Sequence, residues 1–146
     1  MSRENIAASQ RVLEEGFNQG NLDAVDEATS DDYLDHDPLM RDADSEAVKQ
    51  RITAYREAFP DLEVTIEEIF AAGDKVVTRW SANGTFQNAF MGQQPTGQKG
   101  TPVEGIGIDR FDEDGKIAES WGQWDTMQFM KNIGAVPEGA AAGAGS

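Results

Sequence analysis

Residues 103–125 read VEGIGIDRFDEDGKIAESWGQWD, and this stretch decides the fold. Two runs rich in β-branched and aromatic residues flank an acidic turn that ends on Gly115. Such a turn predicts a β-hairpin, because glycine readily adopts the positive φ that a tight reversal needs. The returning run carries Trp121 and Trp124 and ends on Asp125, just before a segment with helical spacing. The stretch therefore predicts two antiparallel strands and a helix that follows them.

The first sixty residues show helical periodicity instead. Apolar residues at helical spacing predict helices over residues 6–17, 22–28 and 45–59. Asn21 is suited to cap the second helix, and Asp44 or Ser45 the third. Between these two helices, the acidic segment 31–38 is predicted to be a loop, because Pro38 disfavours helical structure just before it.

After residue 60 the hydrophobic period changes to two. The pattern predicts strands over 62–66 and 75–82, an extended and mobile connection over 83–100, and a final helix over 127–133. The tail 137–146 is mostly Ala and Gly and is predicted to be disordered. Helices followed by consecutive antiparallel strands indicate an α+β fold in which a twisted sheet can curl around a pocket.

Composition narrows the possible functions. A chain of 146 residues suits one domain, and 12 basic against 27 acidic residues give a formal charge of −15. This charge repels phosphate groups, so we expect no nucleic-acid and no membrane partner. The sequence has no cysteine, which excludes disulfides and thiolate chemistry. The polar start and the lack of a long apolar run predict a cytoplasmic protein.

Asp125 is the first candidate for a catalytic residue. A carboxylate beside two indoles can be desolvated, which raises its pKa and makes it a usable base near neutral pH. An Asp between a strand and a helix can equally be a helix cap, and capping lowers the pKa. The sequence leaves both interpretations open.

His36 is the sole histidine, and it is the second candidate. It could orient a substrate carbonyl, share a proton with Asp125, or bond to loop backbone. A metal site on Asp35, His36 and Asp37 is not favoured, because adjacent residues in an extended loop point in different directions. No phosphate-binding loop is present either, so we expect neither a metal nor a cofactor.

Segments spread over residues 5–135 carry a family resemblance. They are YLDHDP at 33–38, YREAFPDL at 55–62, GDKVVTRW at 73–80, GT at 84–85, FMG at 90–92, PTG at 95–97, GI at 105–106, RF at 110–111, GKIAESW at 115–121, Asp125, and IG at 133–134. In this order and spacing they resemble the SnoaL-like polyketide cyclases, also called ester cyclases, of the nuclear transport factor 2-like superfamily.

The resemblance implies one domain over residues 1–136. Its α+β fold would be a conical barrel, in which a strongly curved antiparallel sheet is wrapped by N-terminal helices around a deep pocket. The resemblance also implies pocket residues, namely Tyr33, Trp80, Phe86, Phe90, Trp121 and Trp124. Many relatives carry a histidine where this chain has Phe86, which removes a polar pocket group, so we expect the substrate to be a polyketide-like or another small carbonyl compound.

Characterised members of this family close a ring of an aromatic polyketide by intramolecular aldol condensation, without metal or cofactor. Their acid/base aspartate matches Asp125, and their histidine, which looks toward the pocket, matches His36. The resemblance thus predicts a cofactor-independent enzyme that acts on a small hydrophobic carbonyl compound. The family usually pairs through the sheet, so a homodimer is expected.

Two alternatives stay open, because one fold can host several functions. A non-catalytic small-molecule-binding or dimerisation module would have Asp125 capping a helix and turned away from the cavity. A ketosteroid-isomerase-like enzyme would need a second protonated acid or a tyrosine in the pocket. Tyr33 and Tyr55 are the two tyrosines, and Tyr55 is predicted to be committed to a helix face.

Overall fold

A single five-stranded sheet organises the molecule, for which a computed structural model describes residues 2–136. The strands are β1 (Thr29–His36), β2 (Glu63–Ala72), β3 (Lys75–Asn83), β4 (Val103–Phe111) and β5 (Ile117–Trp124). They lie in the order β1-β5-β4-β3-β2. Strands β2 to β5 pair antiparallel with their neighbours, whereas β1 pairs parallel with β5.

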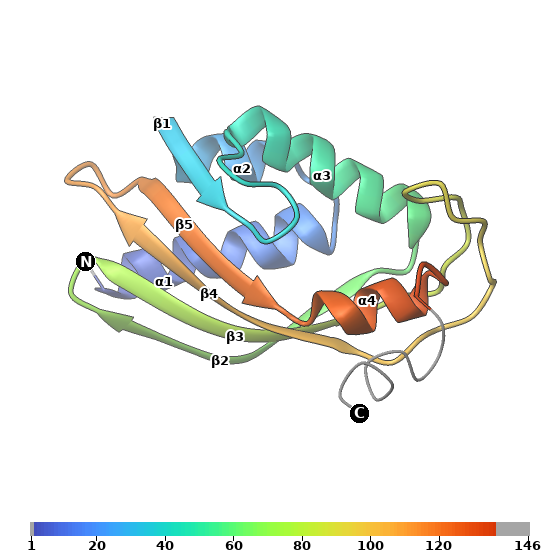
Figure 1. Cartoon of the computed structure of the whole chain (residues 1–146). Coiled ribbons are helices and arrows are strands. Elements are labelled where there is room, and N and C mark those ends of the chain that lie inside the picture. The colour runs from blue at the N-terminus through green and yellow to red at the C-terminus, as the bar shows by residue number, and fades with distance from the viewer. Residues whose placement is uncertain (1, 137–146) are drawn as a thin grey trace.

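Helices cover one face of this sheet (Figure 1). They are α1 (Ser2–Arg11), its π-helical continuation η1 (Val12–Phe17), α2 (Asp23–Ala28), α3 (Ser45–Ala58) and α4 (Thr126–Asn132). The sheet curls around the helices without closing, since β1 and β2 remain its two edges. The α+β prediction is confirmed, but the sheet is open and its β1 edge is parallel. The predicted disordered tail lies outside the described residues.

The hairpin that decides the fold is formed as predicted. Arg110 and Glu119 are register partners on β4 and β5, and their side chains form an ion pair at 3.2 Å. Gly115 has φ of 78°, a conformation that residues with a side chain rarely adopt. The Asp112 carboxylate accepts bonds from two backbone N–H groups of the turn and holds it closed.

The acidic segment 31–38 is not a loop, and this prediction is wrong. Most of it belongs to β1, which pairs with β5 through Asp35↔Ser120 and His36↔Trp121. Side chains alternate along the strand and at the residue after it, so that Tyr33, Asp35 and Asp37 are buried. The alternation could not be recognised from hydrophobicity, because two of these three inward residues are aspartates.

The helix ends differ in how they are capped. Asp44 is the N-cap of α3 and accepts a bond from the Ala47 backbone N–H, as one of the two predictions had it. Asn21 does not cap α2, whose N-cap position is Leu22 without a side-chain bond. The Asn21 amide instead donates to Glu15 at 3.2 Å.

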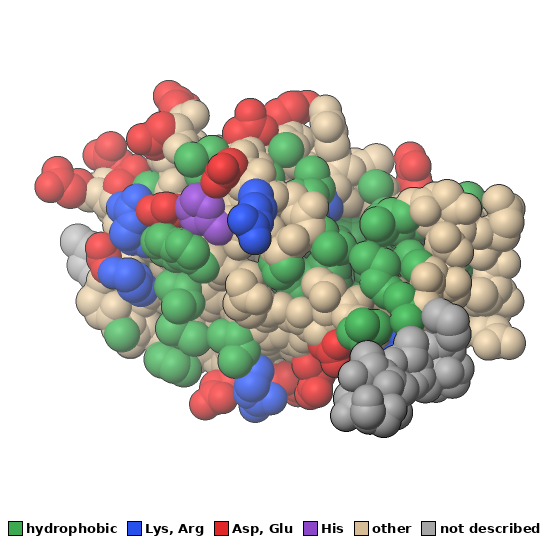
Figure 2. Space-filling model, in the orientation of Figure 1, with side chains coloured by type: hydrophobic (Ala, Val, Ile, Leu, Met, Phe, Trp, Pro, Cys, Tyr) green, Lys and Arg blue, Asp and Glu red, His purple; other side chains and the backbone are tan. Residues whose placement is uncertain are grey.

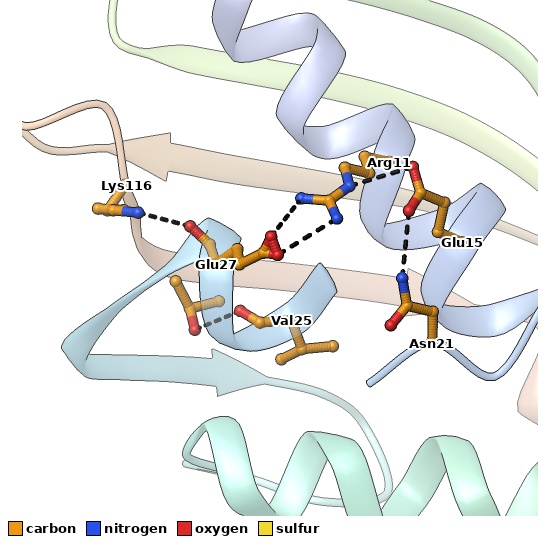
Figure 3. A network of polar contacts seen from close by, with 7 residues as sticks. Arg11, Glu15, Asn21, Val25, Glu27 and Lys116 are labelled. Atoms are coloured by element: carbon orange, nitrogen blue, oxygen red, sulfur yellow. Dashed lines mark hydrogen bonds and ion pairs between the residues drawn. The ribbon is translucent and has the colours of Figure 1, made fainter. Parts of the chain in front are cut away.

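A polar network joins this region to the hairpin (Figure 3). Arg11 forms ion pairs with Glu15, four residues along in η1, and with Glu27 of α2, both at 3.1 Å. Lys116, next to the β4–β5 turn, donates to the Glu27 backbone carbonyl. The network therefore links α1 and α2 to the hairpin, which is far from them in the sequence.

Two apolar clusters fill the space under the helices. One contains Val25, Val48, Ile52, Val76, Phe111 and Ile117, and the other contains Ala58, Phe59, Phe86, Val103, Phe129 and Ile133. The irregular segment between β3 and β4 contributes Phe86 to the second cluster and is held by the bridge Thr85↔Lys99. No helix within residues 2–136 is long and apolar enough to span a membrane.

Candidate active-site cavity

A cavity of about 220 Å³ lies between the covered face of the sheet and the helices. Most of its wall is apolar, including Val12, Leu13, Phe17, Val48, Leu62 and Phe129. The polar side chains that reach it include Ser9, Tyr33, Asp35, Asp37, Arg51, Tyr55, Asp109 and Ser120. An apolar cavity with a few convergent polar groups is the usual form of a small-molecule site.

Glycines make room for this cavity. Gly107 of β4 and Gly122 of β5 are register partners, and both line the cavity. A side chain at either position would project over the sheet, where the nearest atoms to an added Cβ are 3.6 Å and 4.0 Å away. Because neither glycine has a side chain, the backbone of the two central strands forms part of the cavity floor.

Asp109 is the carboxyl group at the centre of the sheet. Its Oδ2 accepts a hydrogen bond from the Ser9 hydroxyl at 2.7 Å, and its Oδ1 accepts one from Ser120 at 2.6 Å. Burial raises the pKa of Asp109 above its ordinary value, although the two serine bonds oppose the shift. Asp109 is therefore an oriented carboxyl whose affinity for a proton is increased.

Strand β1 and helix α3 bring in a second polar group. Asp35 accepts a bond from Arg51 Nη2 at 2.6 Å, and burial raises the pKa of Asp35 despite this pairing. Asp37, on the same side of the chain, accepts bonds from Trp124 Nε1 and from the Leu39 backbone N–H, both at 2.9 Å. Arg51 Nη1 lies 3.9 Å from Asp37 Oδ1 and has no hydrogen-bond partner within the described chain.

Both tyrosines also line the cavity, and Tyr55 does so from α3, the helix on which it was predicted to lie. Burial raises the pKa of Tyr55 to about 12 and raises that of Tyr33 as well. The Tyr55 ring stacks on Phe90 with centroids 5.4 Å apart. The two phenols therefore remain protonated near neutral pH.

Asp125 lies outside this cavity. It is exposed, it is the N-cap of α4, and its Oδ1 accepts a bond from the Gln128 backbone N–H at 3.0 Å. This is the capping interpretation that the sequence left open. A catalytic role for Asp125 stays a prediction, and the position of its carboxylate lends it no support.

His36 faces away from the cavity, so the expectation that it looks toward the pocket is wrong. Its Nε2 lies 2.7 Å from Glu119 and its Nδ1 3.0 Å from Asp42. The hydrogen bond with Glu119 raises the pKa of His36. Figure 2 shows the histidine on the outer surface, with charged and hydrophobic side chains around it. The fold does not place His36 and Asp125 in one site.

The six predicted pocket residues divide into two groups. Tyr33, Trp80 and Trp124 line the cavity, and Trp121 contributes to its wall although its side chain is exposed beside His36. Phe86 and Phe90 do not line it. Phe86 is fully buried against Phe59, so these two predictions are corrected: both phenylalanines support the wall from behind.

Comparison with known proteins identifies the family. A family profile described as SnoaL-like polyketide cyclase matches residues 7–133, which is most of the chain. The chain belongs to the SnoaL-like polyketide cyclase family. The expected resemblance is confirmed. A search of curated proteins found no match.

Solved structures similar to this SnoaL-like protein agree with its fold. AclR of Streptomyces galilaeus, a proposed hydroxylase, is 25% identical with a TM-score of 0.82, over 94% of this chain and 85% of AclR. A proposed SnoaL-like cyclase of Jannaschia sp. CCS1 is 24% identical with a TM-score of 0.81, over 93% and 95% of the two chains. IdmH of Streptomyces antibioticus, a proposed polyketide cyclase, is 27% identical with a TM-score of 0.75, over 89% and 98%.

Sequence reasoning missed the charged groups of the SnoaL-like cavity. Asp109 follows Gly105 and Gly107 at alternate positions of β4, and this pattern was a usable signal. Glycines on one face of a strand mark a place where another group approaches the backbone, so the next residue on that face is a site candidate. Asp35 and Asp37 gave no such signal, because β1 itself was not recognised. The described residues contain no cluster of three or more His, Cys, Asp or Glu suited to hold a metal ion.

Proposed function

We propose that this protein is an acid/base enzyme that needs no cofactor and acts on a small, largely apolar carbonyl compound in the cavity. The observation that carries the proposal is Asp109: an oriented carboxyl with a raised pKa that lines an apolar cavity. In this proposal Asp109 has the acid/base role that the sequence predicted for Asp125.

In the proposed reaction Asp109 accepts a proton from the carbon next to a carbonyl group. The electron pair of that C–H bond forms an enolate, whose carbon attacks a second carbonyl carbon of the same molecule. The alkoxide that results takes up a proton, and Asp109 returns to its starting state by giving one up. The net reaction is an aldol cyclisation, in agreement with the family to which the chain belongs.

Isomerisation is a second candidate, supported by the two buried tyrosines. Tyr33 and Tyr55 line the cavity and stay protonated, so either can donate a hydrogen bond to an enolate oxygen. If no second carbonyl is in reach, the enolate is reprotonated at another carbon. A non-catalytic binding module is the third candidate, and it is supported by the exposed, capping position of Asp125.

Exchange of substrate protons for deuterium tests the first step common to both enzymatic candidates. The purified protein is incubated in D₂O with an aryl β-keto ester or a ketosteroid, and NMR follows the loss of the proton next to the carbonyl. We expect exchange above the buffer rate, and a decrease of about 10²–10⁴ in Asp109→Asn, as for other general bases. The Asn side chain keeps the shape: one serine hydroxyl can still donate to its Oδ1, and the other can rotate to accept from its Nδ2.

Asp125→Asn is measured beside it, because Asn also caps helices well. Loss of exchange in Asp125→Asn with retention in Asp109→Asn would return the acid/base role to Asp125. Ligand binding without exchange in the unchanged protein would favour the non-catalytic module.

A further inference from the structure

The charges that line the cavity do not balance. Asp35, Asp37 and Asp109 reach it, and Arg51 is the one basic residue among the described residues that line it. The Arg51 charge is already shared with Asp35 through the 2.6 Å bond. A carboxylate on a ligand would therefore be repelled by the surplus of acidic groups, and in an apolar cavity such repulsion is weakly screened.

One donor in this wall has no hydrogen-bond partner among the described residues. Arg51 Nη1 makes no hydrogen bond to any described residue, and the Arg51 side chain is only 10% exposed. A buried donor that is left unpaired is unfavourable, so such a group commonly marks a place for a ligand atom. The facing atom is Asp37 Oδ1 at 3.9 Å, which is too long for a hydrogen bond.

The two atoms together fit a hydroxyl group. A hydroxyl oxygen can accept a hydrogen bond from one group while it donates to another. With hydrogen bonds of about 2.8 Å, one oxygen can bridge two atoms that are separated like Arg51 Nη1 and Asp37 Oδ1. A carbonyl oxygen could accept from Arg51 but could donate nothing to Asp37. Nη1 is covered by its neighbours, so the ligand must move the side chains around it, and the adjoining cavity gives them room.

We propose that the cavity selects neutral ligands that carry a hydroxyl group, such as a phenol or an enol, and that this hydroxyl binds between Arg51 and Asp37. The inference rests on the proposed function to the extent that it takes the cavity as the ligand site. It adds the chemical class of the ligand and excludes carboxylates.

Three naphthalene probes of similar shape test this inference by calorimetry or thermal shift with the whole protein. At pH 7, 2-naphthol is neutral and donates a hydrogen bond, 2-methoxynaphthalene is neutral without a donor, and 2-naphthoate is an anion. We expect 2-naphthol to bind roughly tenfold or more tightly than 2-methoxynaphthalene, as a bond to a charged group implies. We expect 2-naphthoate to bind most weakly.

Asp37→Asn removes the negative charge with little change in shape. It should reduce the preference for 2-naphthol and strengthen the binding of 2-naphthoate. Asp32→Asn, on β1 shortly before Asp37 in the chain, is the matched control, because Asp32 is exposed and accepts a bond from Ser30, and it should leave all three affinities unchanged. If Asp37→Asn does not fold, Asp109→Asn removes another acidic group from the same cavity and serves for 2-naphthoate.

Equal binding of 2-naphthol and 2-methoxynaphthalene overturns the hydroxyl site, and 2-naphthoate binding as tightly as 2-naphthol overturns the exclusion of anions. Either result leaves the proposed acid/base function intact. If none of the three probes binds, the cavity is not a ligand site for such compounds, and the inference fails together with the proposed function.

Discussion

Asp109 combines two roles that a surface carboxylate cannot have. Its bond to Ser9 fastens α1 to the centre of the sheet, and its position in the cavity wall makes it available to a ligand. The same burial that raises its pKa makes its ionisation unfavourable for the folded state. A residue can therefore support the reaction and lower the stability of the protein.

This conflict predicts how stability depends on pH. The folded chain holds the Asp109 proton to higher pH than the unfolded chain, so its stability falls as pH rises from about 4 through the folded pKa. Asp109→Asn lacks this loss. We expect the variant to gain free energy of unfolding relative to the unchanged protein across this interval, by about 1.4 kcal/mol for each unit by which the pKa is raised. Urea titrations between pH 4 and 8 measure the difference, and a constant difference contradicts the prediction.

Strand β4 shows how one element serves two environments. Its inward positions are Gly105, Gly107 and Asp109, while Ile106, Ile108 and Arg110 alternate with them on the other face. The two inward glycines occupy different surroundings, so each position favours glycine for a different reason. Gly105 lies under the Trp80 ring and beside Trp124, whereas Gly107 faces open cavity.

Adding one methyl group at each glycine separates these reasons. A Cβ at Gly105 would overlap the Trp80 ring and lie 2.7 Å from Trp124 Cβ, so Gly105→Ala should destabilise the protein by about 1–3 kcal/mol through overpacking. The nearest atom to a Cβ at Gly107 is 3.6 Å away, which is an ordinary contact, so Gly107→Ala should change stability little. Chemical denaturation measures the stability of the two variants. An equal loss in both would contradict the prediction, because it would mean that the Trp side chains move aside or that replacing glycine in the strand backbone is itself the main effect.

Helix α3 and the β4–β5 hairpin were predictable from the sequence for a physical reason. In α3 the buried positions Val48 and Ile52 are apolar, so the helical period is visible in the sequence, and in the β4–β5 hairpin the turn that ends on Gly115 marks the reversal. In and just after β1 the buried positions include Asp35 and Asp37, and the partners that make their burial possible, Arg51 and Trp124, come from other elements of the chain. Most of the cavity's polar groups were hidden for this reason.

At the scale of the whole molecule, the outer face of the sheet carries an apolar stripe. Register partners place Phe70, Val77, Ile108, Trp121 and His36 side by side across all five strands. Phe70 and Trp121 are 48% and 38% exposed, and the neighbouring Ile106 is 50% exposed. Exposed apolar surface of this kind commonly marks a protein–protein interface. It supports the homodimer expected from the sequence, in which both copies would use the same face.

A single charge on this face tests the homodimer. Ile106→Lys should convert a dimer into a monomer, because a buried ammonium opposite its own symmetry mate is strongly unfavourable. Met91→Lys is the control, since Met91 is 57% exposed but lies in the β3–β4 connection rather than on the sheet. Light scattering coupled to size exclusion gives both masses. An unchanged protein that is monomeric at high concentration contradicts the expectation.

The parallel pairing of β1 with β5 has a consequence for the time at which the cavity appears. A ribosome completes β1 before any other strand and its neighbour β5 after all the others. At 5–20 residues per second, the interval between them is on the order of ten seconds. Throughout this interval Asp35 and Asp37 have no sheet to hold them. A ligand of this cavity therefore meets its complete site only on the finished protein, and it can stabilise the product of folding but cannot guide the early steps.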